Sequence, residues 1–164
     1  MQTDKSSHSI QPVLPAPLAM PLKLLPPFVH NRVLLSTLNR LFKQEIADGE
    51  LDFLLGKTVH IRVDDAAINY RFTLENNRFI AAADNRPADL VLGGTLYHYL
   101  LLASREEDSD TLFFNRKLHM EGDTELGLYV KNFLDGLDME SHRAPAYLEA
   151  LLKKSLPVYA RLFG

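Results

Sequence analysis

Histidine and acidic side chains are the groups of this chain that could catalyse a reaction or bind a metal ion. The six histidines are at positions 8, 30, 60, 98, 119 and 142. No two of them have the spacing of a helical zinc site, and no glutamate completes such a site. The acidic run at 105–110 lacks the spacing and the central glycine of an EF-hand, so we interpret it as a solvated loop. The sequence therefore predicts no metal site.

Titratable groups in apolar surroundings are the other candidates for chemistry. His98 lies within a strongly apolar segment, where its titration would respond to an apolar site, although a hydrogen-bonded structural histidine is the commoner case. His60 and His119 fall on the polar phase of expected strands, and Asp64 and Asp65 are typical of a turn. We expect none of these residues to be catalytic.

Motifs of the common enzyme classes are also missing. The chain has no Gly-x-Ser-x-Gly nucleophile motif, no phosphate-binding glycine loop and no dinucleotide-binding glycine pattern. It contains no cysteine, which excludes disulfides, thiolate metal sites and cysteine nucleophiles. We therefore expect a protein that is not an enzyme and that uses no cofactor. The lack of cysteine is compatible with a reducing, cytoplasmic compartment.

Length, apolar content and charge indicate one ordinary domain. The chain has 164 residues and an apolar fraction of 46%, which is enough for a single hydrophobic core. The formal net charge of −3 gives no support for nucleic-acid binding.

The N-terminal segment is apolar but rich in proline. Pro12, Pro15, Pro17 and Pro21 would interrupt the helix of a secretion signal, and no Ala-x-Ala cleavage site follows them. We expect residues 1–27 to form an extended arm and residues 28–164 to form the folded domain. The arm is too apolar for a solvated tail, so docking on the domain and contact with a membrane or a partner both stay open.

An amphipathic helix is expected from Pro27 to the Asp48-Gly49 pair. Its polar arc, which includes Asn39, lies opposite an apolar arc that would pack on the core. Packing on a core is the commoner role of such a helix, but a basic outer face can also lie on an anionic membrane. The candidates for membrane contact are Leu22, Leu24, Leu25, Phe28, Arg32, Arg40 and Lys43.

Alternating apolar and polar residues predict a sheet in the middle of the chain. Residues 58–63 and 68–74 alternate with period two, and the Asn76-Asn77 turn leads into a third antiparallel strand at 78–83. Two further strands are expected at 89–92 and 117–121. With the helices on either side of this block, the pattern predicts an α+β fold: a mainly antiparallel five-stranded sheet with helices packed on one face.

Two later helices have unusual apolar surfaces. The helix expected at 95–103 is apolar nearly all round, so protein or an apolar ligand must cover it on several sides. It is far too short to span a bilayer, which takes about 20 apolar residues. The helix that begins at Gly122-Asp123 has one apolar stripe. Together with the strand between them, these two helices predict the wall of a cavity.

The last part of the chain has the apolar pattern of a helix. A helix is expected at about 145–155, and an apolar turn with Tyr159, Leu162 and Phe163 follows the proline at position 157.

The order of these elements resembles the sterol carrier protein type-two domain family. The resemblance rests on the strand at 88–94, the helix after it, the loop with Asp108 and Asp110, and the Lys-Leu-His-Met-Glu-Gly-Asp run at 117–123. It covers about residues 35–137. The resemblance implies a sterol-carrier-like fold that encloses an apolar, lipid-binding cavity.

A more specific similarity, within that family, is to the accessory factors of bacterial ubiquinone biosynthesis. It is carried by the run from Asp110 to Asn132 and by the upstream segment at 48–54. It implies a non-catalytic factor that holds polyprenylated quinone intermediates, or phospholipid, while separate oxygen-independent hydroxylases act on the ring. The implied partners are these lipids and other ubiquinone biosynthesis proteins.

The lipid tail would then enter between the two apolar helices, with the sheet as the floor. The candidate lipid-binding residues are Tyr70, Phe72, Tyr97, Leu100, Leu101, Leu118, Met120, Leu126, Val130, Phe133 and Leu134. For each of them, ordinary core packing is an equally good interpretation. The alternative function is a protein-interaction or scaffold module of a biosynthetic complex without bound lipid, in which apolar surfaces such as Leu128 and the final turn contact partners or a second copy.

Overall fold

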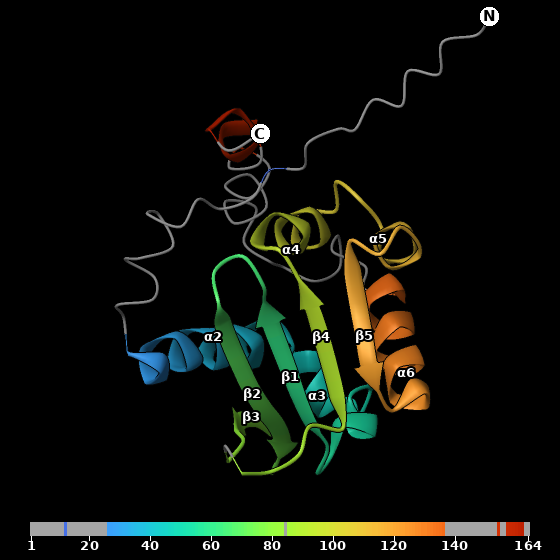
Figure 1. The fold of residues 1–164 in the computed structure, drawn as a ribbon. Helices are drawn as coiled ribbons and strands as arrows, with labels where there is room; N and C mark the ends of the chain where they lie inside the picture. Colours follow the sequence, from blue (N-terminus) through green and yellow to red (C-terminus); the bar gives the residue numbers. More distant parts are fainter. Residues whose placement is uncertain (1–11, 13–25, 84, 137–153, 155–156, 163–164) are drawn as a thin grey trace, which may run out of the picture.

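A five-stranded sheet with helices behind it forms the body of the protein (Figure 1). The structure is a computed structural model that describes residues 12, 26–83, 85–136, 154 and 157–162. The strands are β1 (Thr58–Val63), β2 (Ile68–Glu75), β3 (Arg78–Ala81), β4 (Leu90–Gly94) and β5 (Leu118–Gly122). They lie in the order β3-β2-β1-β4-β5, with β1 and β4 parallel and the other neighbours antiparallel. The predicted α+β fold with a mainly antiparallel sheet is confirmed.

The helices lie on one face of the sheet and across one end of it. Their bounds are α2 (Pro27–Leu41), α3 (Lys43–Ala47), the short 3₁₀ helix η1 (Asp52–Leu54), α4 (Leu96–Ala103), α5 (Ser109–Phe114) and α6 (Thr124–Gly136). Figure 1 shows α2, α3 and α6 behind the strands and α4 across their upper end. Residues 157–162 are helical as well. Of the helix expected at 145–155, residue 154 is described and is helical. The rest of that helix and nearly all of the arm at 1–27 lie outside the described residues.

The apolar phase of each strand points toward the helices and forms the core. Val59, Phe72 and Leu90 face one another across β1, β2 and β4 and are 3%, 6% and 1% exposed. Leu51 and Leu74, at 2% each, extend this cluster toward η1. Burying one such side chain stabilises the fold by about 1.5–3 kcal/mol, so this cluster holds the helices against the sheet.

The expected helix from Pro27 to Gly49 is interrupted. Phe42 leaves the helical conformation, with φ −101° and ψ 24°, and separates α2 from α3. The placement of Asn39 on the outer polar arc was wrong, because its side chain contacts the sheet. Its Oδ1 accepts from the backbone N–H of Phe79 at 2.7 Å, and its Nδ2 donates to the Phe79 carbonyl at 2.9 Å. Asn39 thus occupies the backbone groups that the edge strand β3 would otherwise expose.

Side-chain caps fix where the later helices begin. Thr95 caps α4, since its hydroxyl accepts from the His98 N–H at 3.4 Å, and Asp123 accepts from the N–H groups of Glu125 and Leu126 at 3.0 Å each. Asp108 caps α5 by accepting from the Thr111 N–H at 2.7 Å. The end of the acidic run is therefore the start of a helix and not a loop throughout, because an aspartate at this position satisfies free N–H groups of the first turn.

Candidate functional site

A row of half-buried apolar side chains crosses the sheet beneath the helices. Strand register places one residue from each of four strands in this row: Tyr70, Ile61, Leu92 and Met120. All four are partly exposed, although they lie on the face that the helices cover. The next row toward η1 is buried, as is Leu118 in the next row toward α4. Central strand positions are normally the most buried of a sheet, so this row marks incomplete packing between the layers.

The helices opposite the row are also incompletely buried. Partly exposed apolar residues of α2, of the junction between α2 and α3, and of α6 pack around the core cluster that Ile61, Leu92 and Met120 also contact. They are Leu35, Leu38, Phe42, Phe133 and Leu134. The rings of Phe42 and Phe133 meet edge to face with centroids 5.5 Å apart, so the junction between α2 and α3 contacts α6 there. Gly127 lets α6 approach the sheet, since a Cβ atom at this position would lie 3.2 Å from the Met120 sulfur. The half-buried row and these residues therefore form an apolar layer between the sheet and the helices.

Aromatic residues close the end of this layer next to α4. The hydroxyl of Tyr99 donates to the Leu92 carbonyl at 2.9 Å, and burial raises the pKa of this phenol. Tyr97 stacks on Tyr159 from the C-terminal helical turn. Burial, together with the nearby Asp65 carboxylate, raises the pKa of Tyr159 to about 12. The phenols of Tyr99 and Tyr159 therefore stay neutral, and each ring acts as an apolar body with one polar tip.

The predicted lipid-binding residues fall into three groups. Tyr70 and Met120 belong to the half-buried row, and Phe133 and Leu134 lie across from it on α6. Four others are fully buried in the core: Phe72, Leu118, Leu126 and Val130, at 6%, 2%, 3% and 9% exposure. Tyr97, Leu100 and Leu101 lie on α4, where Tyr97 and Leu100 pack in a second cluster around Val63 and Tyr159. The structure thus brings Met120, Phe133 and Leu134 together around the main core cluster and places Tyr70 with the second cluster. The lipid contacts themselves stay a prediction.

Two members of the row were missed by sequence reasoning. Ile61 and Leu92 were assigned to strands without a role at the site. The alternation in 58–63 does put Ile61 on the apolar phase. What the sequence does not reveal is that β1 pairs in parallel with β4, which sets Leu92 beside Ile61.

The predicted membrane-contact residues are only partly described. Leu22, Leu24 and Leu25 lie outside the described residues, and Phe28 lies in α2. Arg32, Arg40 and Lys43 are exposed on α2 and α3. Within the residues that the structure describes, no helix is both long and apolar enough to cross a bilayer.

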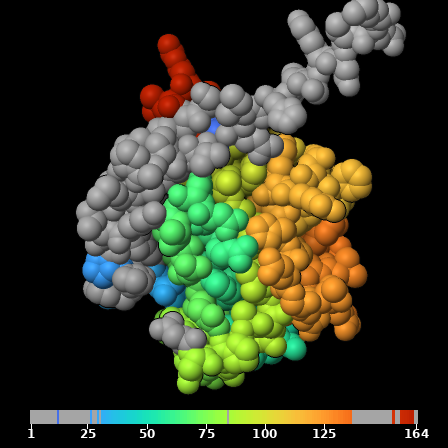
Figure 2. Space-filling model, viewed as in Figure 1, coloured from blue at the N-terminus to red at the C-terminus, as the bar shows by residue number. Residues whose placement is uncertain are grey.

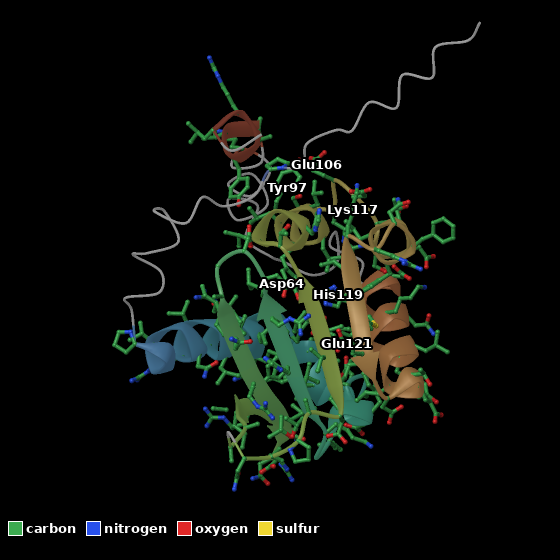
Figure 3. The ribbon with its side chains drawn as sticks, viewed as in Figure 1. Asp64, Tyr97, Glu106, Lys117, His119 and Glu121 are labelled. Atoms are coloured by element: carbon green, nitrogen blue, oxygen red, sulfur yellow. The ribbon has the colours of Figure 1, made fainter. Side chains whose placement is uncertain are left out.

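The opposite face of the sheet is polar. Arg62 connects its charged groups, because Nε donates to Asp64 at 2.7 Å and an Nη lies 2.8 Å from Nε2 of His119. Glu121 lies 3.8 Å from the same guanidinium. Figure 3 shows Asp64, His119 and Glu121 on the side of the sheet that faces the viewer, and in Figure 2 strand side chains form much of this surface. These groups form a surface ion-pair network, which is worth little to stability.

The described part of the chain contains no group of three or more histidine, aspartate or glutamate side chains that could hold a metal ion. His98 is the one buried histidine in that part, at 6% exposure. Burial lowers its pKa, and a hydrogen bond to the Lys117 backbone opposes that shift. The hydrogen bond joins α4 to the residue before β5. The lowered pKa favours the neutral form of the His98 side chain.

A pocket of about 570 Å³ lies at the β2–β3 edge of the polar face, lined by Thr73, Glu75, Ile80 and the loop that follows β3. It is separate from the half-buried apolar row, which is on the other face of the sheet. The cavity expected between the helices and the sheet stays a prediction.

Comparison with known proteins identifies the family. Residues 35–135, which include all five strands, match the model of the SCP-2 sterol transfer family. The ubiquinone biosynthesis accessory factor UbiT of Escherichia coli strain K12 is 40% identical over 137 residues, which cover 84% of this chain and 78% of that protein. UbiT of Escherichia coli O157:H7 matches to the same extent.

Similarity to a solved structure supports the same fold. The UbiJ-SCP2 ubiquinone synthesis protein aligns with a TM-score of 0.53 and 16% identity, covering 65% of this chain and 94% of that chain. With this fold, the match over the whole sheet and the identity to UbiT, the chain belongs to the SCP-2 sterol transfer family.

Proposed function

We propose that this protein is a non-catalytic, lipid-binding accessory factor of ubiquinone biosynthesis. The observation that carries the proposal is the half-buried row of Tyr70, Ile61, Leu92 and Met120 between sheet and helices. The 40% identity to proteins named as accessory factors of ubiquinone biosynthesis supports the pathway. The absence of a metal-binding cluster among the described residues is compatible with a role outside catalysis.

The cargo that suits such a layer is a lipid with a long apolar tail. We infer polyprenylated quinone intermediates, or phospholipid, as the lipid class. Each buried methylene contributes about 0.8 kcal/mol, so ten of them give about 8 kcal/mol, which corresponds to an affinity of about 1 μM before binding costs. A bilayer shelters the same tail equally well, so reversible exchange with the membrane is the expected regime.

Partners and location belong to the same proposal. The protein would present the ring of its cargo to separate oxygen-independent hydroxylases, in the cytoplasm and at the membrane surface. Residues 1–27 would form the arm that reaches the membrane, next to the exposed Arg32, Arg40 and Lys43, and residues 28–164 would form the lipid-binding domain. Anionic lipid attracts such a basic surface by about 1 kcal/mol for each charge close to it. Homo-oligomerisation is a further expectation.

Lipid analysis of the purified protein tests the proposal. Native mass spectrometry with solvent extraction should find about one prenylated ring compound or phospholipid for each chain. Ile61→Glu should abolish lipid retention, because it places a charge in the apolar layer. Val33→Glu is the matched control, since Val33 is 63% exposed on α2. Circular dichroism checks that both variants fold.

Two outcomes would contradict the proposal. One is a folded wild-type protein that carries no lipid and takes up none from added vesicles, and that outcome favours the protein-interaction module. The other is a folded Ile61→Glu variant that retains lipid as the wild type does.

A further inference from the structure

The polar face of the sheet contains the pocket of about 570 Å³, whose volume is within the range of about 300–1,000 Å³ typical of small-molecule sites. The loop from β3 to β4 crosses the lower end of the sheet on this face, on the side away from α2, α3 and α6 (Figure 1). Among the lining residues are Thr73, Glu75, Ile80, Ala82, Arg86 and Pro87. The pocket therefore combines an apolar wall with a few polar groups.

Buried hydroxyl groups next to this pocket have no hydrogen-bond partner. Thr73, which lines the pocket, is only 2% exposed, and its cross-strand neighbour Thr58 is 0% exposed. Neither hydroxyl is hydrogen-bonded to any residue in the described part of the chain. A buried polar group left unsatisfied costs about 1–3 kcal/mol, so a side chain kept in this state points to a ligand or water at the site.

Positive charge exceeds negative charge around the pocket among the described residues. Glu75 is the acidic residue of its wall, and Arg86 lies 3.4 Å from that carboxylate. Arg78 is the cross-strand neighbour of Glu75, so the carboxylate has two cations beside it. Arg71 donates to the Arg86 carbonyl and holds the loop in place. Its Nε is buried without a partner among the described residues, which leaves a further donor close to Thr73.

We propose that this pocket binds a small molecule that carries an anionic oxygen group, carboxylate or phosphate, on a compact apolar body. The Arg86 guanidinium pairs with the anionic group, and the Thr73 hydroxyl, which the pocket wall shields from solvent, rotates toward that group and donates to it. Ile80, Ala82 and Pro87 contact the apolar body. The guanidinium is suited to this role because its planar donors match carboxylate and phosphate geometry. The site lies across the sheet from the apolar row, so it does not depend on lipid binding.

Amide-detected NMR titration of the full chain tests the site with three probes: benzoate, phenyl phosphate and inorganic phosphate. Benzoate or phenyl phosphate should produce saturable shifts at Thr73, Ile80 and Arg86, with a dissociation constant on the order of 1 mM. Arg86→Gln should weaken binding about tenfold, and Thr73→Val should weaken it about fivefold by removing one hydrogen bond at nearly constant volume. Arg161→Gln, at an exposed position of the C-terminal helical turn, and Thr37→Val, at an exposed position of α2, should change nothing.

Three results would overturn the assignment. They are the absence of saturable shifts with both aromatic probes, binding that survives both pocket substitutions, and equal affinity for inorganic phosphate, which would remove the apolar body from the ligand. Spectra of the folded variants exclude loss of structure as the cause. Lipid content, measured in the same samples, should be unchanged by Arg86→Gln, so failure here is distinguishable from failure of the lipid-binding proposal.

Discussion

The rings of Tyr97 in α4 and Tyr159 near the C-terminus are stacked, with centroids 5.6 Å apart and an interplanar angle of 18°. Tyr159 also donates to Oδ2 of Asp65 at 3.4 Å, and Oδ1 of the same carboxylate accepts from the Leu96 N–H at 2.8 Å. Asp65 therefore joins the β1–β2 turn, the first turn of α4 and the C-terminal helical turn. This contact fixes the C-terminal turn against the end of the apolar layer.

Replacing the stacked ring tests how much this contact contributes. Tyr159→Ala should lower the free energy of unfolding by about 3 kcal/mol, because it removes a ring that is 8% exposed and leaves a void against Tyr97. Leu162→Ala, three residues on and 66% exposed, should cost less than about 0.5 kcal/mol. Urea unfolding measures both, and equal effects of the two substitutions would show that the stack is not formed.

Stability should depend on pH through His98. Burial lowers the folded-state pKa of His98 below the ordinary value of 6.5, so below that pH the unfolded chain binds a proton that the folded chain does not. This contribution to stability is complete above pH 6.5 and is lost as the pH falls toward the folded-state pKa. Thermal unfolding of wild type and His98→Gln between about pH 7.5 and about pH 5 should show a steeper loss in the wild type. Parallel curves would contradict a buried, neutral His98.

Alanine substitutions at two glycines with positive φ should show how much backbone strain and steric overlap each cost in stability. Gly122 has φ +108°, and a Cβ atom there would lie 2.4 Å from the Asp89 carbonyl oxygen. Gly56 has φ +68° with nothing within 4 Å of such an atom. Gly56→Ala should cost about 1 kcal/mol, the penalty of left-handed backbone alone, whereas Gly122→Ala should cost more than about 3 kcal/mol. Similar losses in chemical denaturation would contradict the close approach of β5 to the segment before β4.

The contact between α2 and the sheet edge is also testable. Asn39→Ala leaves both backbone groups of Phe79 without their partner, and Phe79 is only 3% exposed. We expect a loss of about 1–3 kcal/mol in the free energy of unfolding. Asn132→Ala, at an exposed position of α6, should change it by less than about 0.5 kcal/mol. Hydrogen exchange of the Phe79 amide should accelerate in Asn39→Ala alone, and unchanged exchange would show that Asn39 does not protect this amide.

The local pattern of residue types in the sequence predicted most of the strands and helices. The period-two alternation in β1 and β2, the turn at Asn76-Asn77 and the caps Thr95 and Asp123 are signals within a few residues, and each lies where it was expected. The break at Phe42 and the contact from Asn39 to Phe79 were not predicted, because they depend on how α2 meets β3. A helix cap at Asp108 was missed for a different reason, since the surrounding acidic residues also suit a loop.

The candidate site was predictable only in part. Tyr70 and Met120 could be placed on the apolar phase of their strands from alternation alone, and Phe133 and Leu134 on the apolar stripe of α6. Whether such residues are core or half-exposed depends on the fit between layers, which no local pattern encodes. The row itself depends on the parallel pairing of β1 with β4, a contact between segments about 30 residues apart. The pocket on the polar face was not expected, because Thr73 and Arg86 carry no motif.

Methyl-detected NMR of Ile61, Leu92 and Met120 during titration with a short-chain phospholipid or a prenylated phenol tests the central claim most directly. We predict saturable shifts at these three residues, together with contacts between their methyl groups and the lipid tail. The methyls of Leu112, a residue of α5 that is 0% exposed, should stay unchanged. Shifts confined to exposed apolar residues such as Val33 and Leu162, with the row unaffected, would contradict lipid binding between the sheet and the helices.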